Sequence, residues 1–247
     1  MKQDVKQGVL LYAGKAKQVF STDDPELLWV YYLDQATALN GKKKVAIDGK
    51  GTLNLHISGL LFKELAATGF PTHFVTDMDN QNMLVRRAKM IPLEVVVRNR
   101  ASGHFVSRFN VTPLRVLDPA IHEFYYKSDA LDDPFMNDEQ IVALGIAPRA
   151  TLDTLRTMAD QVNTWLTARW ARAGIELVDF KLEFGRLADG TLVLADELSP
   201  DNMRLIDAQT HASLDKDVFR QDEGPLVPVY AEVLRRLQAT QQEVHHV

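Results

Sequence analysis

The sequence predicts an α+β protein in two lobes, and three observations lead to this class. The first ninety residues hold several short apolar or alternating segments, which are typical of strands, and a single helical segment. The remainder mixes strand-like segments with helices of different lengths. Strands and helices nowhere alternate regularly as in a doubly wound sheet, and no internal repeat is present. We place the lobe boundary near Pro92, which separates residues 1–91 from residues 92–247.

The N-terminal lobe is expected to contain one helix, at residues 51–68. Leu53, Ile57 and Leu61 recur there at helical spacing, and Gly69 can end the helix. Strands are expected at residues 9–12, 18–20, 27–33, 71–76 and 83–91.

The C-terminal lobe is expected to contain the longest helix of the chain, at residues 151–173, with Gly174 as its stop signal. Asn137 is a suitable N-cap for a shorter helix at residues 137–144. The remaining elements are expected to be helices at residues 101–109 and 228–238 and strands at residues 93–98, 121–127 and 178–185.

Composition excludes several classes of protein and of site. The 247 residues include no cysteine, which excludes disulfides, thiolate metal sites and a cysteine nucleophile. A formal net charge of −5 and a pI of about 5.8 argue against a nucleic-acid binder. No apolar run approaches the ~20 residues of a membrane span, and the first residues lack the apolar core of a signal peptide. We therefore expect a cytoplasmic protein with no membrane and no nucleic-acid partner.

The most informative segment is residues 178–185, in which apolar and charged residues alternate strictly. This is the period of a strand with one buried face and one charged face. Asp189-Gly190 gives a turn signal before residues 194–197. If these two residues formed a two-residue loop, Glu183 would pair with Asp196.

Two carboxylates opposed in this way would lie ~4.5–5.5 Å apart at Cβ and repel each other. A hard cation such as Mg²⁺ removes the repulsion, and proteins typically hold it with one or two carboxylates plus substrate phosphates. The alternative is an exposed hairpin with solvated charges, in which Lys181 neutralises Glu183 from two residues away. The hairpin alone favours neither interpretation.

Positive charge is concentrated in a short glycine-containing segment near the N-terminus. Gly14-Lys15-Ala16-Lys17 lies in a tight connection between two expected strands, where glycine permits close approach of a ligand and two lysines suit a polyphosphate. The segment is not a Walker A loop, and an ordinary hairpin with surface lysines would show the same pattern. Lys50, at the start of the first helix, is another candidate anion contact.

Arginines form a second group of candidate anion contacts. Arg98 ends an apolar strand just before Ser102 and His104 at a helix start, and Arg204 follows residues 199–201. Arginine forks and helix amides suit a phosphate or a carboxylate, although a surface ion pair is the alternative for each arginine. Residues 129–133 contain three aspartates, which could bind a metal or an amino group or could form a plain turn.

Taken in order, these segments resemble the SAICAR synthetase (phosphoribosylaminoimidazole-succinocarboxamide synthase) family of purine biosynthesis. Besides residues 14–17 and 178–185, the matching motifs are residues 40–44, 92–99, 125–127, 129–134, 195–197 and 199–201. The resemblance covers nearly the whole chain and implies a two-lobed fold of mainly antiparallel sheets with an ATP cleft between the lobes. Residues 1–91 would then bind ATP phosphates, and residues 92–247 would bind metal and substrate.

The activity that the resemblance implies is an ATP-dependent ligation. The carboxylate of carboxyaminoimidazole ribonucleotide (CAIR) condenses with the amine of L-aspartate, and the products are the succinocarboxamide (SAICAR), ADP and phosphate. A carboxylate is a poor electrophile, so its phosphorylation to an acyl phosphate would supply a leaving group. Mg²⁺ is the implied cofactor, and a homodimer is the implied assembly.

The resemblance also implies roles for individual residues. Glu183 and Asp196 would hold Mg²⁺, while Lys181 and Asp179 would act on the substrate. The residues implied to bind ATP are Gly14, Lys15, Lys17, Lys127 and Glu94, with backbone groups of residues 90–94 at adenine, and those implied to bind CAIR are Arg98, Ser102, His104 and Arg204. The family commonly has a serine that contacts the substrate phosphate where this chain has His104, so either His104 or the nearby Ser102 would replace it.

Two other functions would share part of this pattern. A kinase-like phosphotransferase should also carry His-Arg-Asp and Asp-Phe-Gly motifs, which this sequence lacks. A non-catalytic nucleotide-binding regulator would bind ATP without turning it over.

Overall fold

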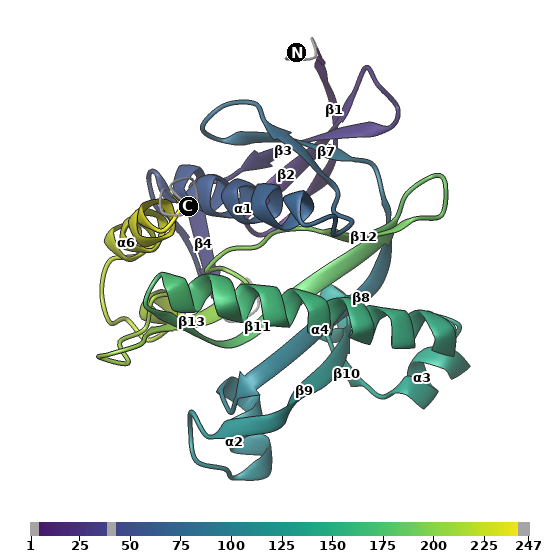
Figure 1. Cartoon of the computed structure of the whole chain (residues 1–247). Coiled ribbons are helices and arrows are strands. Elements are labelled where there is room, and N and C mark those ends of the chain that lie inside the picture. Colours follow the sequence, from purple (N-terminus) through teal and green to yellow (C-terminus); the bar gives the residue numbers. More distant parts are fainter. Residues whose placement is uncertain (1–4, 39–42, 242–247) are drawn as a thin grey trace.

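Two antiparallel sheets form the frame of the protein (Figure 1). The computed structural model describes residues 5–38 and 43–241, so part of the motif at residues 40–44 lies outside the described residues. The first sheet, at the top of Figure 1, has five strands in the order β1-β2-β3-β7-β6. These strands are β1 (Gln7–Ala13), β2 (Lys17–Thr22), β3 (Leu27–Tyr32), β6 (Phe74–Asp77) and β7 (Asn82–Arg86).

The second sheet has six strands and is built around two long neighbouring strands, β8 and β11. Its order is β10-β9-β8-β11-β12, and β13 also pairs with β11. The strands are β8 (Lys89–Arg100), β9 (Val116–Tyr126), β10 (Phe135–Met136), β11 (Ile175–Arg186), β12 (Leu192–Ala195) and β13 (Met203–Asp207). A separate two-stranded ribbon consists of β4 (Gln35–Ala38) and β5 (Lys43–Ala46).

Two long helices cover the sheets. Helix α1 (Lys50–Ala67) contacts β3, β6 and β7 of the first sheet, and α4 (Arg149–Arg172) lies across β8 and β11 of the second (Figure 1). The remaining helices are α2 (Gly103–Phe109), α3 (Asp138–Ala143), α5 (Asp217–Arg220), α6 (Leu226–Ala239) and the short 3₁₀ helix η1 (Asp129–Leu131). Among the described residues, no helix has the length and apolar character that a membrane span requires.

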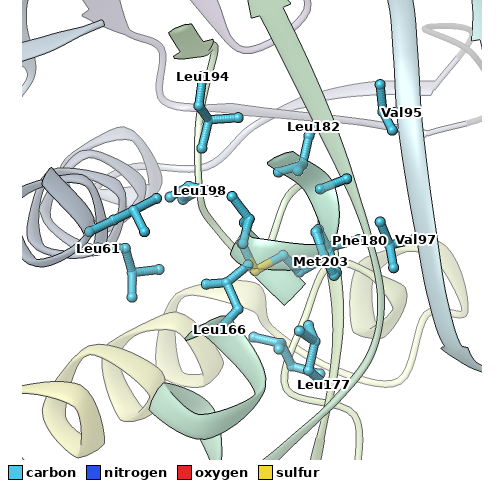
Figure 2. Packing of buried hydrophobic residues seen from close by; sticks show 14 of the residues in the cluster. Leu61, Val95, Val97, Leu166, Leu177, Phe180, Leu182, Leu194, Leu198 and Met203 are labelled. Atoms are coloured by element: carbon cyan, nitrogen blue, oxygen red, sulfur yellow. The ribbon is translucent and has the colours of Figure 1, made fainter. Parts of the chain in front are cut away.

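One large apolar cluster connects elements from both halves of the chain. Figure 2 shows side chains from α1 (Leu61), α4 (Leu166) and β11 (Phe180, Leu182) gathered in this cluster. Helix α1 also packs against α6, near the end of the chain. Helix α1 therefore shares its core with the second half of the sequence, although its strand neighbours belong to the first sheet.

Most predicted helices are confirmed to within two or three residues, and the predicted cap of α3 is confirmed in detail. The Asn137 side chain accepts the Gln140 backbone N–H at 2.9 Å, and the Gln140 side chain accepts the Asn137 backbone N–H at 2.9 Å. The ribbon β4–β5 and strand β13 were not predicted, because none of the three has a distinctive apolar alternation.

The predicted register of the charged hairpin is wrong by one residue. The backbone N–H of Leu187 donates to Thr191, so the loop has three residues, and Gly190 adopts a φ of 87° within it. Glu183 therefore pairs with Ala195 rather than with Asp196. A three-residue loop with glycine in the left-handed region is a common hairpin alternative to the two-residue turn.

Pro92 lies inside a continuous strand rather than in a break between two strands. Strand β8 runs from Lys89 to Arg100. Its pairing with β11 shifts between the Glu94–Glu183 pair and the Met90–Gly185 pair, so Pro92 falls in a bulge. Proline has no N–H to give to a ladder, and a bulge is one of the places where a strand tolerates it.

Candidate functional site

Three adjoining cavities lie along strands β8 and β11, and two of them are also lined by strands of the first sheet. The lysine-rich cavity, of about 570 Å³, is lined by Lys15, Lys17, Lys127, Lys181 and Lys216 together with carboxylates. This volume is in the range of ligand pockets, ~300–1,000 Å³.

The other two cavities share walls with the lysine-rich cavity. The arginine cavity, of about 310 Å³, is lined by Arg98, Arg204 and Asp179, among others, and shares Glu94, Lys181, Asp201 and Asn202 with it. The apolar cavity, of about 230 Å³, is lined mainly by aliphatic side chains of β2, β3, β7 and β8 and shares Lys17, Lys127, Glu183 and Asp196 with it.

The turn between β1 and β2 brings two lysines to the lysine-rich cavity. The Gly14 N–H donates to the Lys17 carbonyl at 2.8 Å, which closes the turn. A Cβ at Gly14 would approach the Tyr12 ring to 3.0 Å, so the tight packing of this turn favours glycine. Lys15 pairs with Asp129 at 2.8 Å across the mouth of the cavity, where both side chains are exposed.

Lys17 lies deeper in the lysine-rich cavity than Lys15, beside two carboxylates. Its ammonium lies 2.5 Å from Asp196 and 3.4 Å from Glu197. Burial alone would lower the pKa of Lys17, but Asp196 and Glu197 outweigh burial and raise the pKa above its usual value. The same lysine acts with Lys181 and Lys127 to hold the pKa of Asp196 below its usual range, against the opposing effect of burial.

Strand β11 places Asp179, Lys181 and Glu183 at alternate positions that face the cavities. Asp179 is 4% exposed and Glu183 is 2% exposed, so the alternative of an exposed hairpin with solvated charges is wrong, although the pairing of Lys181 with Glu183 that it included is confirmed.

Lys181 neutralises a pair of carboxylates that differs from the predicted pair. In the β8–β11 register Glu183 lies opposite Glu94, and the Lys181 ammonium contacts both, at 3.0 Å and 2.8 Å respectively. Lys127 also pairs with Glu183. These carboxylates hold the pKa of Lys181 well above its usual value, although burial alone would lower it.

The carboxylates of Glu183, which is buried, and Asp196, which is half-buried, both line the lysine-rich and the apolar cavity. Within residues 5–38 and 43–241, no group of three His, Asp or Glu side chains is arranged to hold a metal ion. Two carboxylates that leave the other coordination positions to substrate phosphates are the usual donor set for Mg²⁺. The residues present therefore fit a magnesium ion that is bound together with a phosphate ligand.

In the arginine cavity, Asp179 is the centre of a group of hydrogen-bond donors. Arg98 donates to it at 2.7 Å, Arg204 at 3.0 Å, and Ser102 also donates to it. The buried Arg98 has a raised pKa because Asp179 and Glu123 outweigh the effect of burial. His104 lines the same cavity from the first turn of α2.

Gly103 is needed for this arrangement. Its φ is 52°, and a Cβ there would lie 2.9 Å from the Arg204 guanidinium. The Arg204 guanidinium therefore occupies the space that a Cβ at position 103 would need. Because glycine has no Cβ, α2 and β13 can approach each other at this point.

The structure brings the predicted site residues together from distant parts of the chain. Every residue predicted to bind ATP, metal or substrate lines one of the three cavities, except Ser102, which lies behind the arginine cavity and bonds to Asp179 and Arg204. The predicted roles themselves stay predictions.

One candidate anion contact is engaged elsewhere. Lys50 is fully buried and pairs with Asp201, whose other oxygen accepts a hydrogen bond from Tyr230 at 2.6 Å. It is therefore part of an internal network that fixes Asp201 rather than a free anion contact.

Sequence reasoning missed several residues of the site. Asp201 and Asn202 line both the lysine-rich and the arginine cavity, and Lys216 lines the former with a pKa lowered by burial. The only signal for Asp201 was its place in the Ser-Pro-Asp motif, which resembles a plain turn, and Lys216 lies in no recognisable motif.

Comparisons with known proteins agree along the whole chain. The sequence model of the family described as SAICAR synthetase matches residues 10–237. The phosphoribosylaminoimidazole-succinocarboxamide synthase of Lacticaseibacillus paracasei is 65% identical over 229 residues, which cover 93% of this chain and 95% of that protein. The protein of the same name from Oenococcus oeni is 55% identical over 92% of this chain and 95% of its own length.

Solved structures have the same fold. The phosphoribosylaminoimidazole-succinocarboxamide synthase from Ehrlichia chaffeensis superposes with a TM-score of 0.91 at 39% identity, covering 94% of this chain and 99% of that one. A SAICAR synthetase in complex with ADP superposes with a TM-score of 0.89 at 42% identity, covering 92% and 97% respectively. These matches confirm the predicted α+β class, and the chain belongs to the SAICAR synthetase family.

Proposed function

We propose that this chain is a phosphoribosylaminoimidazole-succinocarboxamide synthase, which uses ATP to join CAIR to L-aspartate and releases SAICAR, ADP and phosphate. The observation that carries the proposal is the pair of adjoining cavities that share Lys181, one with lysines and carboxylates and the other with three arginines. ATP and CAIR are both anionic, and this acidic protein lines the two cavities with five lysines and three arginines.

The lysine-rich cavity is proposed to take the triphosphate. Lys15, Lys17 and Lys127 would contact its oxygens, and Gly14 allows the β1–β2 turn to approach it closely. Glu183 and Asp196 would hold Mg²⁺, which when bound neutralises charge on the phosphates and on the reacting carboxylate. The ammonium groups now paired with these carboxylates would turn toward the phosphates. The base is proposed to occupy the apolar cavity, beside the backbone of residues 90–94, of which Met90 lines this cavity and Glu94 lines the adjoining lysine-rich cavity.

The arginine cavity is proposed to take CAIR. Arg98 and Arg204 would hold its phosphate with Ser102 and His104, and Asp179 would accept hydrogen bonds from its polar groups. Asp179 also keeps both guanidinium groups in place. Lys181, between the two cavities, would contact the CAIR carboxylate as it accepts the γ-phosphoryl group, and its charge would stabilise the developing oxyanion.

The larger arrangement is also part of the proposal. Residues 1–91 would act as the ATP-phosphate lobe and residues 92–247 as the metal and substrate lobe, with the ATP cleft between them. We propose a homodimer in the cytoplasm, on the basis of the family to which the chain belongs.

Release of ADP, measured with CAIR in the presence and absence of L-aspartate, tests the proposed reaction. A ligase forms SAICAR and sustains ADP release only when both substrates are present. A phosphotransferase would release ADP with CAIR alone and accumulate a phosphorylated product, and a nucleotide-binding regulator would release none. Either of the last two results would overturn the proposal.

A further inference from the structure

One side chain that lines the apolar cavity, His73, is buried and has a polar atom without a partner. The side chain is 6% exposed, and its Nε2 makes no hydrogen bond. Buried polar atoms are nearly always hydrogen-bonded, because an unpaired one gives up its interactions with water without replacement. His73 lies in the wall of a cavity, so a ligand could supply the missing partner.

The position of the imidazole is fixed from several sides. The His73 N–H donates to Leu194 at 2.8 Å, and its carbonyl accepts from Arg86 at 2.7 Å, so the backbone is held between β12 and β7. The ring packs at 5.1 Å, centroid to centroid, from Phe62 of α1. A ring held in this way is preorganised for a ligand that enters the cavity.

His73 is uncharged in the folded protein. Burial lowers the pKa of His73 to about 3 and outweighs the opposing effect of Asp196, while Lys17 and Arg86 act in the same direction as burial. A neutral imidazole has one nitrogen that donates and one that accepts. It is therefore better suited to the edge of a heteroaromatic ring than to a phosphate.

We propose that His73 hydrogen-bonds the edge of the adenine base that carries N6 and N7. This inference rests on the proposed function, because it places the triphosphate in the lysine-rich cavity and the base in the neighbouring apolar cavity. The two cavities share Lys17, Lys127, Glu183 and Asp196, so a base in one lies beside phosphates in the other. Aliphatic walls suit the flat faces of adenine, while its polar edges need partners. The backbone near Met90 is proposed to take one edge, which leaves the N6/N7 edge to His73.

The test is a set of nucleotide affinities for the wild-type protein, His73→Phe and His73→Gln. The ligands are ATP, 7-deaza-ATP, which lacks N7, and purine riboside triphosphate, which lacks the 6-amino group. His73→Phe keeps a ring of similar size and should weaken ATP binding about 3- to 10-fold, the range expected for one hydrogen bond. The analogue that lacks the contacted atom should bind the wild-type protein more weakly than ATP does, by a similar factor. The affinity of that analogue should be the same for His73→Phe as for the wild-type protein. His73→Gln, which retains a donor and an acceptor, should recover part of the affinity for ATP.

Phe62→Leu is the matched control, because it loosens the packing of the imidazole and keeps its nitrogens. It should lower thermal stability and leave the ratio of ATP to analogue affinity unchanged. If His73→Phe weakens all three nucleotides equally, or none of them, His73 is only a packed core residue and the inference is overturned.

Two further outcomes are decisive. If His73→Phe fails to fold, the analogue affinities of the wild-type protein and His73→Gln decide, since an equal analogue ratio in both would overturn the inference. A wild-type protein that binds no ATP would overturn the proposed function and this inference together. A wild-type protein that forms SAICAR but shows no coupling between His73 and the analogues would overturn this inference alone.

Discussion

At the scale of single residues, the site is a set of carboxylates whose charges are compensated by lysines. Glu183 is almost completely buried and is paired with both Lys181 and Lys127, and Asp196 is paired with Lys17. A buried carboxylate needs such compensation, because burial without a partner strongly disfavours the charged form. The same oxygens are the donors that a magnesium ion with bound phosphates would use.

Glu183→Gln and Asp196→Asn should each lower kcat at least about 100-fold, because an amide is a far poorer magnesium ligand and metal-assisted stabilisation is worth several kcal/mol. The readout is SAICAR formation over a range of Mg²⁺ concentrations, with folding checked by circular dichroism. Glu176→Gln, on the same strand but paired with Arg100, is the matched control and should keep its activity. Near-normal turnover of either site variant at ordinary Mg²⁺ would rule out the metal assignment.

His104 should contribute to CAIR affinity through a hydrogen bond. Its imidazole lines the arginine cavity, where it would donate to the substrate phosphate. His104→Ala should therefore weaken CAIR binding about 3- to 10-fold, the range expected for one hydrogen bond, and leave ATP binding nearly unchanged. His104→Ser, which keeps a donor, should retain more of the CAIR affinity, as measured by calorimetric titration. Equal CAIR affinities of the wild-type protein and both variants would show that His104 does not contact the phosphate.

Individual charged residues were predictable only where a motif singled them out. Lys17, Arg98 and Glu183 lie in segments whose composition alone suggests a ligand. Lys216 lines the lysine-rich cavity but lies in no motif, and its importance follows from packing among elements that are far apart in sequence. A single sequence contains no signal for such packing.

At the scale of elements, the arginine cavity depends on how closely α2 approaches β13. Gly103 begins α2 with a positive φ, and the Arg204 guanidinium lies against it. Arg204 is held from the other side by Asp217 of α5 at 2.8 Å. The guanidinium therefore has little room to move aside.

Gly103→Ala should raise the KM for CAIR about 10-fold or more and leave the KM for ATP nearly unchanged, because the new Cβ displaces a charge-assisted contact worth ~1.5–3 kcal/mol. Gly145→Ala is the matched control, since Gly145 has a similar φ of 67° and no atom within 4 Å of its would-be Cβ. Both variants should lose some stability from the positive φ. Equal KM values for CAIR in the two variants would show that the contact with Arg204 has no role in substrate binding.

The capping box of α3 should contribute measurably to stability. Asn137→Ala removes the side chain that accepts the Gln140 N–H, which costs ~1 kcal/mol for a typical N-cap. For a chain of 247 residues this corresponds to a fall in Tm of about 2–4 °C. Thermal unfolding followed by circular dichroism measures it, and catalytic constants below the transition should stay the same. An unchanged Tm would mean that α3 is held by its packing alone.

Elements with a strong local signal were predicted well, and those set by pairing were not. The amphipathic pattern of α4 and the cap of α3 are local, and both were predicted. The register of the β11–β12 hairpin depends on whether its loop has two or three residues, and Asp189-Gly190 is compatible with both. Pro92 suggested a break, because the bulge that accommodates it exists only once β8 pairs with β11.

At the scale of the whole molecule, the two parts of the chain share one core, and this core contains a carboxyl group with a raised pKa. Asp215, between β13 and α5, accepts backbone N–H groups of Leu205 at 2.8 Å and Asp217 at 2.7 Å. Burial, aided by the Asp217 carboxylate, nevertheless raises the pKa of Asp215 to about 7. Asp215 is 2% exposed, so its ionisation must be accommodated inside the protein.

The free energy of unfolding should fall as pH rises toward 7 because of Asp215. In the unfolded chain an aspartate loses its proton near pH ~3.9, whereas in the native state Asp215 keeps it up to about pH 7. Between these two pH values the native state therefore binds more protons than the unfolded chain. The contribution of Asp215 to the free energy of unfolding is complete below pH ~3.9 and is lost as the pH rises past about 7. Urea unfolding at pH 5 and pH 8 measures the change. In Asp215→Asn the free energy of unfolding should change less between the two pH values than in the wild-type protein, even if the variant is less stable at both. An equal change in both proteins would contradict the prediction.

Strand β8 fixes the distances between the three cavities. Its residues Met90, Glu94 and Arg98 line the apolar, lysine-rich and arginine cavities in succession, all on one unbroken strand. Met90 lies opposite Gly185 of β11 and Arg98 opposite Asp179, so at a rise of ~3.3 Å per residue the six β11 steps between them span about 20 Å. Strand β8 is paired with β11 along this length and with β9 from Leu93 onward, so the separation between the two ends of the site is set before any ligand arrives. The protein would therefore discriminate among ligands by length as well as by charge, rejecting pairs whose reactive ends fall short of one another or overlap.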